Sequence, residues 1–208
     1  MPTLRLTYFD SAGRAEPVRI ALHMAGLPFE DRRVKFPEFA ALKAEGTLPL
    51  GSLPVLEVDG VPLVQTAAML RYVARLGDTG LYPTDPLRAF VVDSALDSMN
   101  DTLSHALVPS FFERDMEKKL AMRAEWVAGP MTRVLTYIEG LLERFGGPFL
   151  GGASLSIADL VVAHQVQQIR AGHLDGVTME ALAPYPRIGA LAEATLADPR
   201  VAAWSSRS

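Results

Sequence analysis

The N-terminal part of the sequence alternates between strand-like and helix-like patterns, and this alternation restricts the possible folds more than any other feature. "LRLTYF" (4–9) is rich in strand formers. "EPVRIALHMAGLP" (16–28) has apolar residues at helical spacing and then a glycine and a proline, which end a helix. The same pair of patterns recurs in residues 29–36 and 38–46. A strand–helix unit therefore occurs twice.

Two further strand-like runs and a helix follow. "PVLEVDGVPLVQ" (54–65) has Asp59-Gly60 at its centre, the strongest short-range signal for a hairpin. "TAAMLRYVARLG" (66–77) is amphipathic at helical spacing. The element order is then βαβαββα, an α/β domain predicted to span residues 1–79.

The pattern changes at "GDTGLYPTDP", whose glycines and prolines indicate a linker, placed at residues 80–86. Beyond it we find no convincing strand, so residues 87–208 are predicted to form an all-helical domain. The fold class is α/β plus all-α. Helical periodicity covers four segments: 87–113, 117–145, 156–171 and 186–196. Gly129-Pro130 lies within the second of them and predicts a kink or a break.

Composition excludes several classes of function. The 208 residues include no cysteine, so disulfides, thiolate metal sites and a thiol nucleophile of the chain's own are excluded, and any sulfur chemistry must come with a ligand. The net charge of −4 comes without a Lys/Arg-rich block, which argues against nucleic acid as a partner. We see neither an apolar run long enough to cross a membrane nor a signal peptide, so a cytoplasmic location and no membrane partner are expected.

Several motifs follow one another in an order and at a spacing that resemble those of one family. They are "LTYFDSAGRAEPVR", "GSLPVLEVDG", "QTAAMLRY", "MNDT", "FLGGASLSIADL" and "PRVAAW". In these motifs the chain is similar to cytosolic glutathione S-transferases of the tyrosine type, in particular the sigma, pi, mu and alpha classes. That resemblance implies a thioredoxin-like N-terminal domain that binds glutathione, a helical domain that contributes the hydrophobic substrate site, and a homodimer.

Tyr8, at the end of the first predicted strand, is the candidate catalytic group. A free thiol with a pKa of about 8.5 is only about 3% thiolate at pH 7, and the thiolate is the nucleophile. A tyrosine hydroxyl that donates a hydrogen bond to sulfur lowers the pKa of the thiol. By resemblance, Arg14 supports Tyr8 electrostatically or lies near the glycyl end of glutathione. The alternatives are core packing for Tyr8 and a surface or helix-capping role for Arg14.

Two motifs are candidates for binding the peptide backbone and the γ-glutamyl end of glutathione. By resemblance, Leu53 offers its backbone groups to the cysteinyl part, and Pro54 is cis; the alternative is an ordinary trans proline at the start of a strand. Ser52 stands where the family commonly has Gln. Gln65 and Thr66 match the family's pair for the γ-glutamyl end, and a helix N-terminus suits a carboxylate. Thr66 also fits a helix N-cap.

The resemblance also implies contacts at the glycyl end and with the electrophile. Lys43 is the candidate for the glycyl carboxylate, although most lysines are solvated. Phe39 stands where relatives often have Trp, and Phe111 where some have an active-site tyrosine. Such aromatic residues are more often part of the core. The candidates for the hydrophobic substrate site are Phe9, Gly13, Val108, Phe111, Phe112 and Trp204.

Charge patterning predicts an interface between two copies of the chain. Asp93, Asp97 and Asp101 recur at i, i+4 and i+8, whereas Arg71 and Arg75 form a basic pair on the preceding helix. Opposite stripes suit a two-fold interface, and the alternative is a solvated face. By resemblance, Asp101 contacts the γ-glutamyl amine of the neighbouring subunit's glutathione.

Ser156 and Asp159 are three residues apart before an apolar helix and predict a capping box, which belongs to folding and not to catalysis. The sequence has no G-x-S-x-G, Walker or G-x-G-x-x-G motif. The histidines lack the spacing of metal ligands, so we expect no metal; they are His23, His105, His164 and His173.

The predicted function is conjugation of the glutathione thiolate to hydrophobic electrophiles, with glutathione as co-substrate. Two alternatives remain open at this stage. One is a glutathione-dependent isomerase that resembles prostaglandin synthases, and the other is a non-enzymatic, crystallin-like or ligand-carrying relative.

Overall fold

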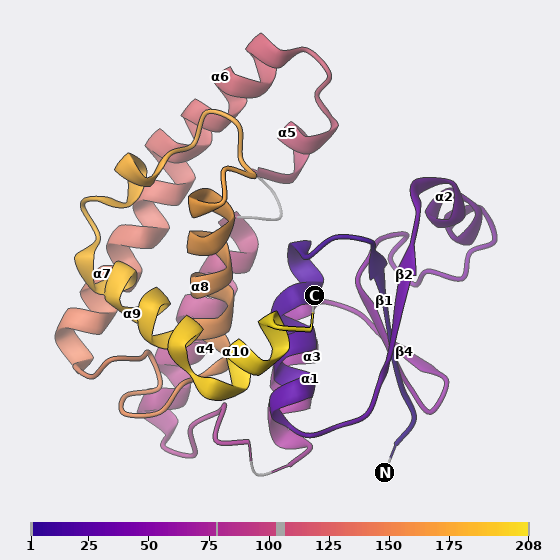
Figure 1. Cartoon of the computed structure of the whole chain (residues 1–208), viewed down its shortest axis with the longest axis horizontal. Coiled ribbons are helices and arrows are strands. Elements are labelled where there is room, and N and C mark those ends of the chain that lie inside the picture. The colour runs from indigo at the N-terminus through magenta and orange to yellow at the C-terminus, as the bar shows by residue number, and fades with distance from the viewer. Residues whose placement is uncertain (1, 78, 103–106, 208) are drawn as a thin grey trace. The chain divides into compact units, whose positions relative to one another are not determined.

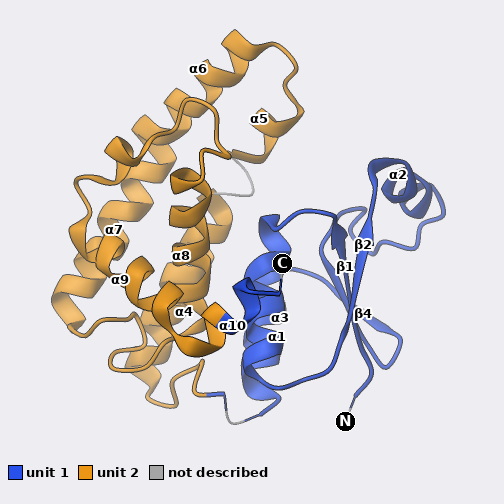
Figure 2. Cartoon of the chain, viewed as in Figure 1, with its two compact units in different colours: residues 1–79, 203–208 blue, residues 80–202 orange. Residues whose placement is uncertain are grey.

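The computed structural model describes residues 2–77, 79–102 and 107–207 and divides the chain into two compact units. The first unit comprises residues 1–79 together with 203–208, and the second comprises residues 80–202 (Figures 1 and 2). The last six residues therefore join the first unit, whereas the sequence analysis assigns them to the helical domain.

The first unit has the predicted βαβαββα order, because each predicted strand and helix forms close to its expected position. A short 3-10 turn, η1 (Gly13–Ala15), precedes the first helix. The elements are β1 (Leu4–Phe9), α1 (Glu16–Met24), β2 (Glu30–Val34), α2 (Phe36–Ala44), β3 (Val55–Val58), β4 (Val61–Leu63) and α3 (Thr66–Arg75).

The described strands form one sheet in the order β2-β1-β3-β4. β1 pairs parallel to β2 and antiparallel to β3, and β3 pairs antiparallel to β4. Asp59 and Gly60 both have positive φ, 50° and 82°, which fits the tight hairpin turn predicted there. Figure 1 shows α1 and α3 on one side of the sheet and α2 on the other. Leu6 and Leu56 of the sheet are fully buried, as are apolar side chains of α1 and α3.

The strand register brings several chain segments to the same edge of the sheet. Phe9 pairs with Val34, so β1 and β2 end together. Thr7 pairs with Val55, so β3 begins beside the end of β1. Leu63, the last residue of β4, pairs with Leu56 near the start of β3. The end of β1 and the segments before β3, after β2 and after β4 therefore meet at one edge.

The described residues of the second unit form helices joined by loops and include no β-strand, as predicted; an isolated β-bridge joins Phe149 and Gly152. The expected run 87–113 is interrupted: α4 ends at Asp101, α5 begins at Val108, and residues 103–106 lie outside the described part of the chain. The helices are α4 (Pro86–Asp101), α5 (Val108–Phe112), α6 (Met116–Trp126), α7 (Thr132–Phe145), α8 (Ile157–Arg170), α9 (Pro186–Ala197) and α10 (Pro199–Ser205). A 3-10 turn, η4 (Met179–Leu182), lies between α8 and α9. Helix α10 begins in the second unit, and its last residues belong to the first.

The interruption predicted at Gly129-Pro130 is a π-helical turn, η3 (Val127–Met131), between α6 and α7. Proline removes a backbone donor from the helix, and the wider turn accommodates it. The Thr132 hydroxyl donates to the carbonyl of Val127 at 2.7 Å, which satisfies one acceptor of the turn. The sequence predicts a kink or a break here, and the structure shows an interruption of the α-helix by a change of helix type.

Helix α8 lies at the centre of the second unit, and the predicted capping box begins it. Asp159 accepts hydrogen bonds from the backbone N–H of Ser156 at 2.7 Å and of Leu150 at 2.9 Å. Burial raises the pKa of Asp159 to about 6, and the hydrogen bonds act in the opposite direction. The pair therefore fixes the start of the central helix. Among the described residues, no helix has both the length and the apolar character of a membrane span.

Candidate functional site

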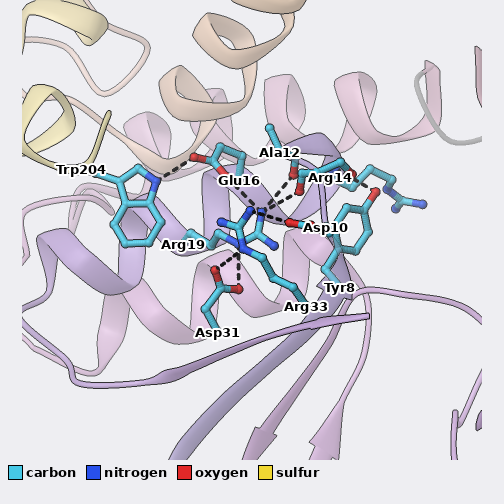
Figure 3. A network of polar contacts seen from close by, with 10 residues as sticks. Tyr8, Asp10, Ala12, Arg14, Glu16, Arg19, Asp31, Arg33 and Trp204 are labelled. Carbon is cyan, nitrogen blue, oxygen red and sulfur yellow. Dashed lines mark hydrogen bonds and ion pairs between the residues drawn. The ribbon is translucent and has the colours of Figure 1, made fainter. Parts of the chain in front are cut away.

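Tyr8 lies at the sheet edge where the chain segments meet. Its side chain is buried, with 8% of the residue exposed, and its ring meets that of Phe9 edge-on at 5.4 Å between centroids. The hydroxyl oxygen accepts a hydrogen bond of 3.2 Å from the backbone N–H of Arg14 (Figure 3). Because a phenol can accept and donate at once, this bond leaves the hydroxyl proton available for another acceptor.

Gly13 holds the turn that closes over Tyr8. Its φ is +42°, a backbone conformation that residues other than glycine rarely adopt. A Cβ atom at this position would lie 2.6 Å from the Tyr8 hydroxyl oxygen, closer than atoms can approach. The glycine predicted to line the hydrophobic substrate site therefore also lets the backbone approach the phenol.

Arg14 follows in the turn η1, and its guanidinium is partly buried. Burial lowers the pKa of Arg14 from its usual value, and interaction with the Tyr8 side chain acts in the opposite direction. The supporting role of Arg14 stays a prediction.

Leu53 and Pro54 lie beside the end of β1. Their peptide bond is cis, as the resemblance implies. They directly precede Val55, whose partner in β1 is Thr7, so Pro54 lies opposite Tyr8 in the register. Leu53 is buried. The structure thus brings the predicted backbone-binding segment next to the predicted thiolate donor.

The segment after β4 presents a buried hydroxyl at a helix N-terminus. Gln65 has φ +75° and is the N-cap of α3. Thr66 is the first helical residue, only 3% exposed, and its Oγ1 atom is buried without a hydrogen-bond partner among the described residues. The N-cap alternative for Thr66 is therefore wrong, since Gln65 occupies that position. A buried unpaired hydroxyl beside the first N–H groups of a helix can donate hydrogen bonds to an anionic ligand.

Helix α2 starts where β2 ends, at the same edge. Lys43 is exposed near the end of α2. The Lys43 side chain lies beside Gly51, because a Cβ atom built on Gly51 would be 3.5 Å from Lys43 Cε. Phe39 packs edge-on against Phe9 at 5.1 Å, so this phenylalanine contributes an apolar surface where an indole would also offer a donor. Ser52 is exposed.

Phe36 is a neighbour of the site that the sequence analysis missed. Its ring stacks on Phe9 at 5.5 Å with 19° between the planes, and 59% of the residue is exposed. Phe9, Phe36 and Phe39 therefore form a continuous aromatic surface that extends from Tyr8 toward solvent. The spacing of Phe36 and Phe39 at i and i+3 on a helix was the available signal.

The other candidates for the hydrophobic substrate site lie in two places. Val108, Phe111 and Phe112 form most of α5 in the second unit, where both phenylalanines are exposed and the Arg123 guanidinium lies 5.3 Å from the Phe111 ring centroid. Trp204 lies in the first unit, against residues of α1. Their predicted role in binding the electrophile stays a prediction.

Asp101 is the last residue of α4 in the second unit. Asp93, on the same helix, accepts a hydrogen bond of 2.6 Å from the Tyr82 hydroxyl, so one member of the acidic stripe has a partner within its own unit. Of the histidines, His105 lies outside the described residues. Among the residues that are described, no three potential metal ligands come together.

Comparisons with known proteins agree with this geometry. Residues 4–75 match the family described as "Glutathione S-transferase, N-terminal domain", and residues 100–208 match "Glutathione S-transferase, C-terminal domain". The chain is 37% identical to glutathione S-transferase 1 of Ascaris suum over 167 residues, 78% of each chain. It is 30% identical to the hematopoietic prostaglandin D synthase of Gallus gallus over 207 residues, 98% of this chain and 96% of the relative.

Among solved structures, the chain is similar to the monomeric glutathione S-transferase Na-GST-3 of the hookworm Necator americanus. The TM-score is 0.81 at 30% sequence identity, with 99% of this chain and 97% of that chain covered. The likeness therefore extends through both units.

The close approach at Gly13 predicts that Gly13→Ala costs more stability than the same change at another left-handed glycine. Gly26→Ala is the matched control, because Gly26 has φ +64° and no atom of the described residues lies within 4 Å of the place where its Cβ would be. Backbone strain should cost about 1–2 kcal/mol in both variants, and the contact with Tyr8 should add about 1 kcal/mol or more in Gly13→Ala alone. Unfolding in urea measures both. Equal losses would contradict a tight fit between Gly13 and the phenol.

Proposed function

The chain belongs to the cytosolic glutathione S-transferase family, and we propose that Tyr8 is the group that keeps its bound glutathione ionised. The observation that carries this proposal is the hydrogen bond from the Arg14 N–H to the Tyr8 hydroxyl oxygen. With its acceptor side engaged, the hydroxyl directs its proton to a second acceptor, and a thiolate placed at this edge of the sheet is that acceptor.

The remaining pieces of this edge fit one molecule of glutathione. We assign the backbone of Leu53, before the cis Pro54, to the cysteinyl part, because strand-edge groups pair with an extended peptide. Gln65 and Thr66 take the γ-glutamyl end, supported by the unpartnered Thr66 hydroxyl, among the described residues, at the start of α3. Lys43 takes the glycyl carboxylate.

The reaction needs no group beyond these. The thiol proton goes to solvent, the thiolate attacks an electrophilic carbon, and a sulfur–carbon bond forms as the leaving group departs with its electron pair. With an aryl halide, for example, the products are the aryl thioether and halide. Phe9 and Gly13 beside Tyr8, together with Val108, Phe111 and Phe112 of α5, are proposed to contact the hydrophobic electrophile. The exposed ring of Phe36 extends that surface.

We further propose a cytoplasmic homodimer. Reduced glutathione is abundant in the cytosol. The basic pair of Arg71 and Arg75 complements the acidic stripe of Asp93, Asp97 and Asp101, as a two-fold interface requires, and Asp101 would reach the neighbouring subunit's glutathione.

Light scattering at micromolar protein should therefore give twice the chain mass. Replacement of Arg71 and Arg75 by Glu should shift the protein toward monomer, because each acidic stripe would then face a like charge. A strictly monomeric wild type, which is how the Necator americanus relative is described, would contradict the dimer.

Tyr8→Phe tests the catalytic assignment because it removes only the hydroxyl. The pKa of the bound glutathione thiol should rise by about one unit or more, and glutathione should bind nearly as before. Loss of a charge-assisted hydrogen bond predicts about a tenfold to hundredfold fall in turnover near neutral pH. The deficit should shrink as the pH rises above the thiol pKa of the variant, because both enzymes then carry the anion.

The readouts are a titration of thiolate absorbance and turnover of an aryl halide. Tyr137→Phe is the matched control, since Tyr137 donates its hydroxyl proton to Ser94 in the second unit at 3.0 Å. Unchanged turnover of Tyr8→Phe at pH 6.5, or an unshifted titration, would move the donor role to another group. The Ser11 hydroxyl in the same loop would be tested next.

Thr66→Val tests the γ-glutamyl site through two effects of opposite sign. The free protein should keep its stability or gain about 1 kcal/mol, because a buried unpaired hydroxyl is replaced by a methyl group. Glutathione should bind about fivefold to tenfold more weakly, because one hydrogen bond is lost.

Thr195→Val is the control for this change. Thr195 lies in α9, is 1% exposed and also has an Oγ1 atom without a partner among the described residues. It should show the same effect on stability with unchanged glutathione affinity. Calorimetry and urea unfolding separate the two effects, and unaltered glutathione binding by Thr66→Val would contradict the assignment.

A further inference from the structure

A charged side chain that none of the preceding roles uses lies fully buried beside the site. Arg19, on α1, has 0% exposure although arginine is among the residues least often buried. A buried guanidinium is tolerated only where its charge is compensated and most of its donors are hydrogen-bonded. Its partners therefore show what this side chain holds in place.

Arg19 binds the loop that follows Tyr8. Its Nη1 atom donates to the backbone carbonyls of Ser11 at 2.9 Å and Ala12 at 3.3 Å, directly before Gly13 (Figure 3). Its Nε atom donates to the Asp31 carboxylate in β2 at 2.9 Å. The guanidinium carbon lies 5.9 Å from the centroid of the Tyr8 ring. One side chain thus ties the loop to the sheet and covers the phenol.

Glu16 orients this guanidinium from the other side. The Oε2 atom of Glu16 accepts from Arg19 Nη1 at 3.0 Å, and the Oε1 atom accepts from the indole N–H of Trp204 at 2.7 Å (Figure 3). The carboxylate is therefore held by a donor on each oxygen, one from α1 and one from the end of the chain. Its first-turn position in α1 also suits a negative charge.

Trp204 is fixed in the first unit by ring contacts as well. Its indole lies 5.7 Å from the His23 ring and 6.0 Å from the Phe29 ring, between centroids. Trp204 lies in the segment that belongs to the first unit. The chain's last residues are thus connected to the loop behind Tyr8 by one continuous series of hydrogen bonds, from Trp204 through Glu16 to Arg19.

We propose that Trp204 is a positioning residue for the thiolate-activating loop and acts on Tyr8 through Glu16 and Arg19. This inference rests on the proposed role of Tyr8. Without the indole donor, the partly exposed Glu16 carboxylate exchanges its contact with Arg19 for solvent, and the buried guanidinium loses an orienting partner. The Ser11 and Ala12 carbonyls are then held less firmly, and so is the hydrogen bond between the Arg14 N–H and the Tyr8 hydroxyl.

Trp204→Phe removes the indole N–H and keeps an aromatic ring. The pKa of the bound glutathione thiol should rise by about half a unit, and aryl-halide turnover at pH 6.5 should fall about threefold. The two enzymes should converge at high pH, and the KM values for glutathione and for the electrophile should stay within about twofold of wild type.

Trp126→Phe is the matched control, since Trp126 is the other of the chain's two tryptophans. Its indole is buried in the second unit and donates to the Thr102 carbonyl at 3.3 Å, so this variant also loses one indole hydrogen bond. Trp126→Phe should leave the pKa of the bound thiol unchanged, even if its thermal stability falls as much as that of Trp204→Phe. If Trp126→Phe raised the thiol pKa equally, general destabilisation would explain the effect of Trp204→Phe, and the inference would be overturned.

Glu16→Gln tests the same connection at its middle. The amide oxygen still accepts from the indole, but the charge and one acceptor facing Arg19 are lost, so the thiol pKa should rise by at least as much as in Trp204→Phe. In a Tyr8→Phe background, Trp204→Phe should add no further shift, because a residue that acts through the phenol has nothing left to position.

Several outcomes would overturn the inference while leaving the Tyr8 assignment intact. One is a bound-glutathione thiol pKa that equals the wild-type value in Trp204→Phe, although Tyr8→Phe raises it. Another is a raised KM for the electrophile alone, which would make Trp204 part of the substrate wall. A third is a rise in the thiol pKa on Trp204→Phe that is equally large in the Tyr8→Phe background. An unshifted thiol in Tyr8→Phe itself would instead overturn the proposed function.

Discussion

The pairing of β1 with a strand on each side is the constraint on which the site depends. Because β2 runs parallel to β1 and β3 runs antiparallel to it, the end of β1, the start of β3 and the ends of β2 and β4 meet at one edge. This strand pairing brings Tyr8, the cis Leu53-Pro54 bond and the start of α3 to the same edge. A one-residue slip of β1 would turn the phenol to the other face of the sheet.

The absence of cysteine determines what this edge has to supply. The chain has no thiol, so the nucleophile enters with glutathione, and the protein contributes groups that bind the tripeptide and favour its anion. A hydrogen bond to the thiolate is enough for that task, since one pKa unit corresponds to about 1.4 kcal/mol. In the mechanism we propose, the chemistry depends on the position of the Tyr8 hydroxyl, which Gly13 and the Arg14 N–H fix from the backbone.

Local signals predicted most of this arrangement from the sequence. The period-2 and helical patterns gave the βαβαββα order, and Asp59-Gly60 gave the hairpin. Gly129-Pro130 marked the place where the α-helix is interrupted, but not that the interruption is a π-helical turn. The cis bond before Pro54 followed from the resemblance and not from the dipeptide itself.

Long-range contacts were not predictable in the same way. The attachment of residues 203–208 to the first unit depends on contacts such as that between Trp204 and Glu16, which are 188 positions apart. Arg19 was missed because an arginine three residues after a glutamate usually forms a surface ion pair, and only the fold shows that it is buried.

The most direct measurement for Tyr8 as thiolate donor is a crystal structure of the chain with glutathione bound. The expected result is a sulfur atom within hydrogen-bond reach of the Tyr8 hydroxyl, with the γ-glutamyl carboxylate at Thr66 and the cysteinyl backbone paired with Leu53. A sulfur atom placed on the Ser11 hydroxyl, or a tripeptide bound away from this sheet edge, would contradict that assignment.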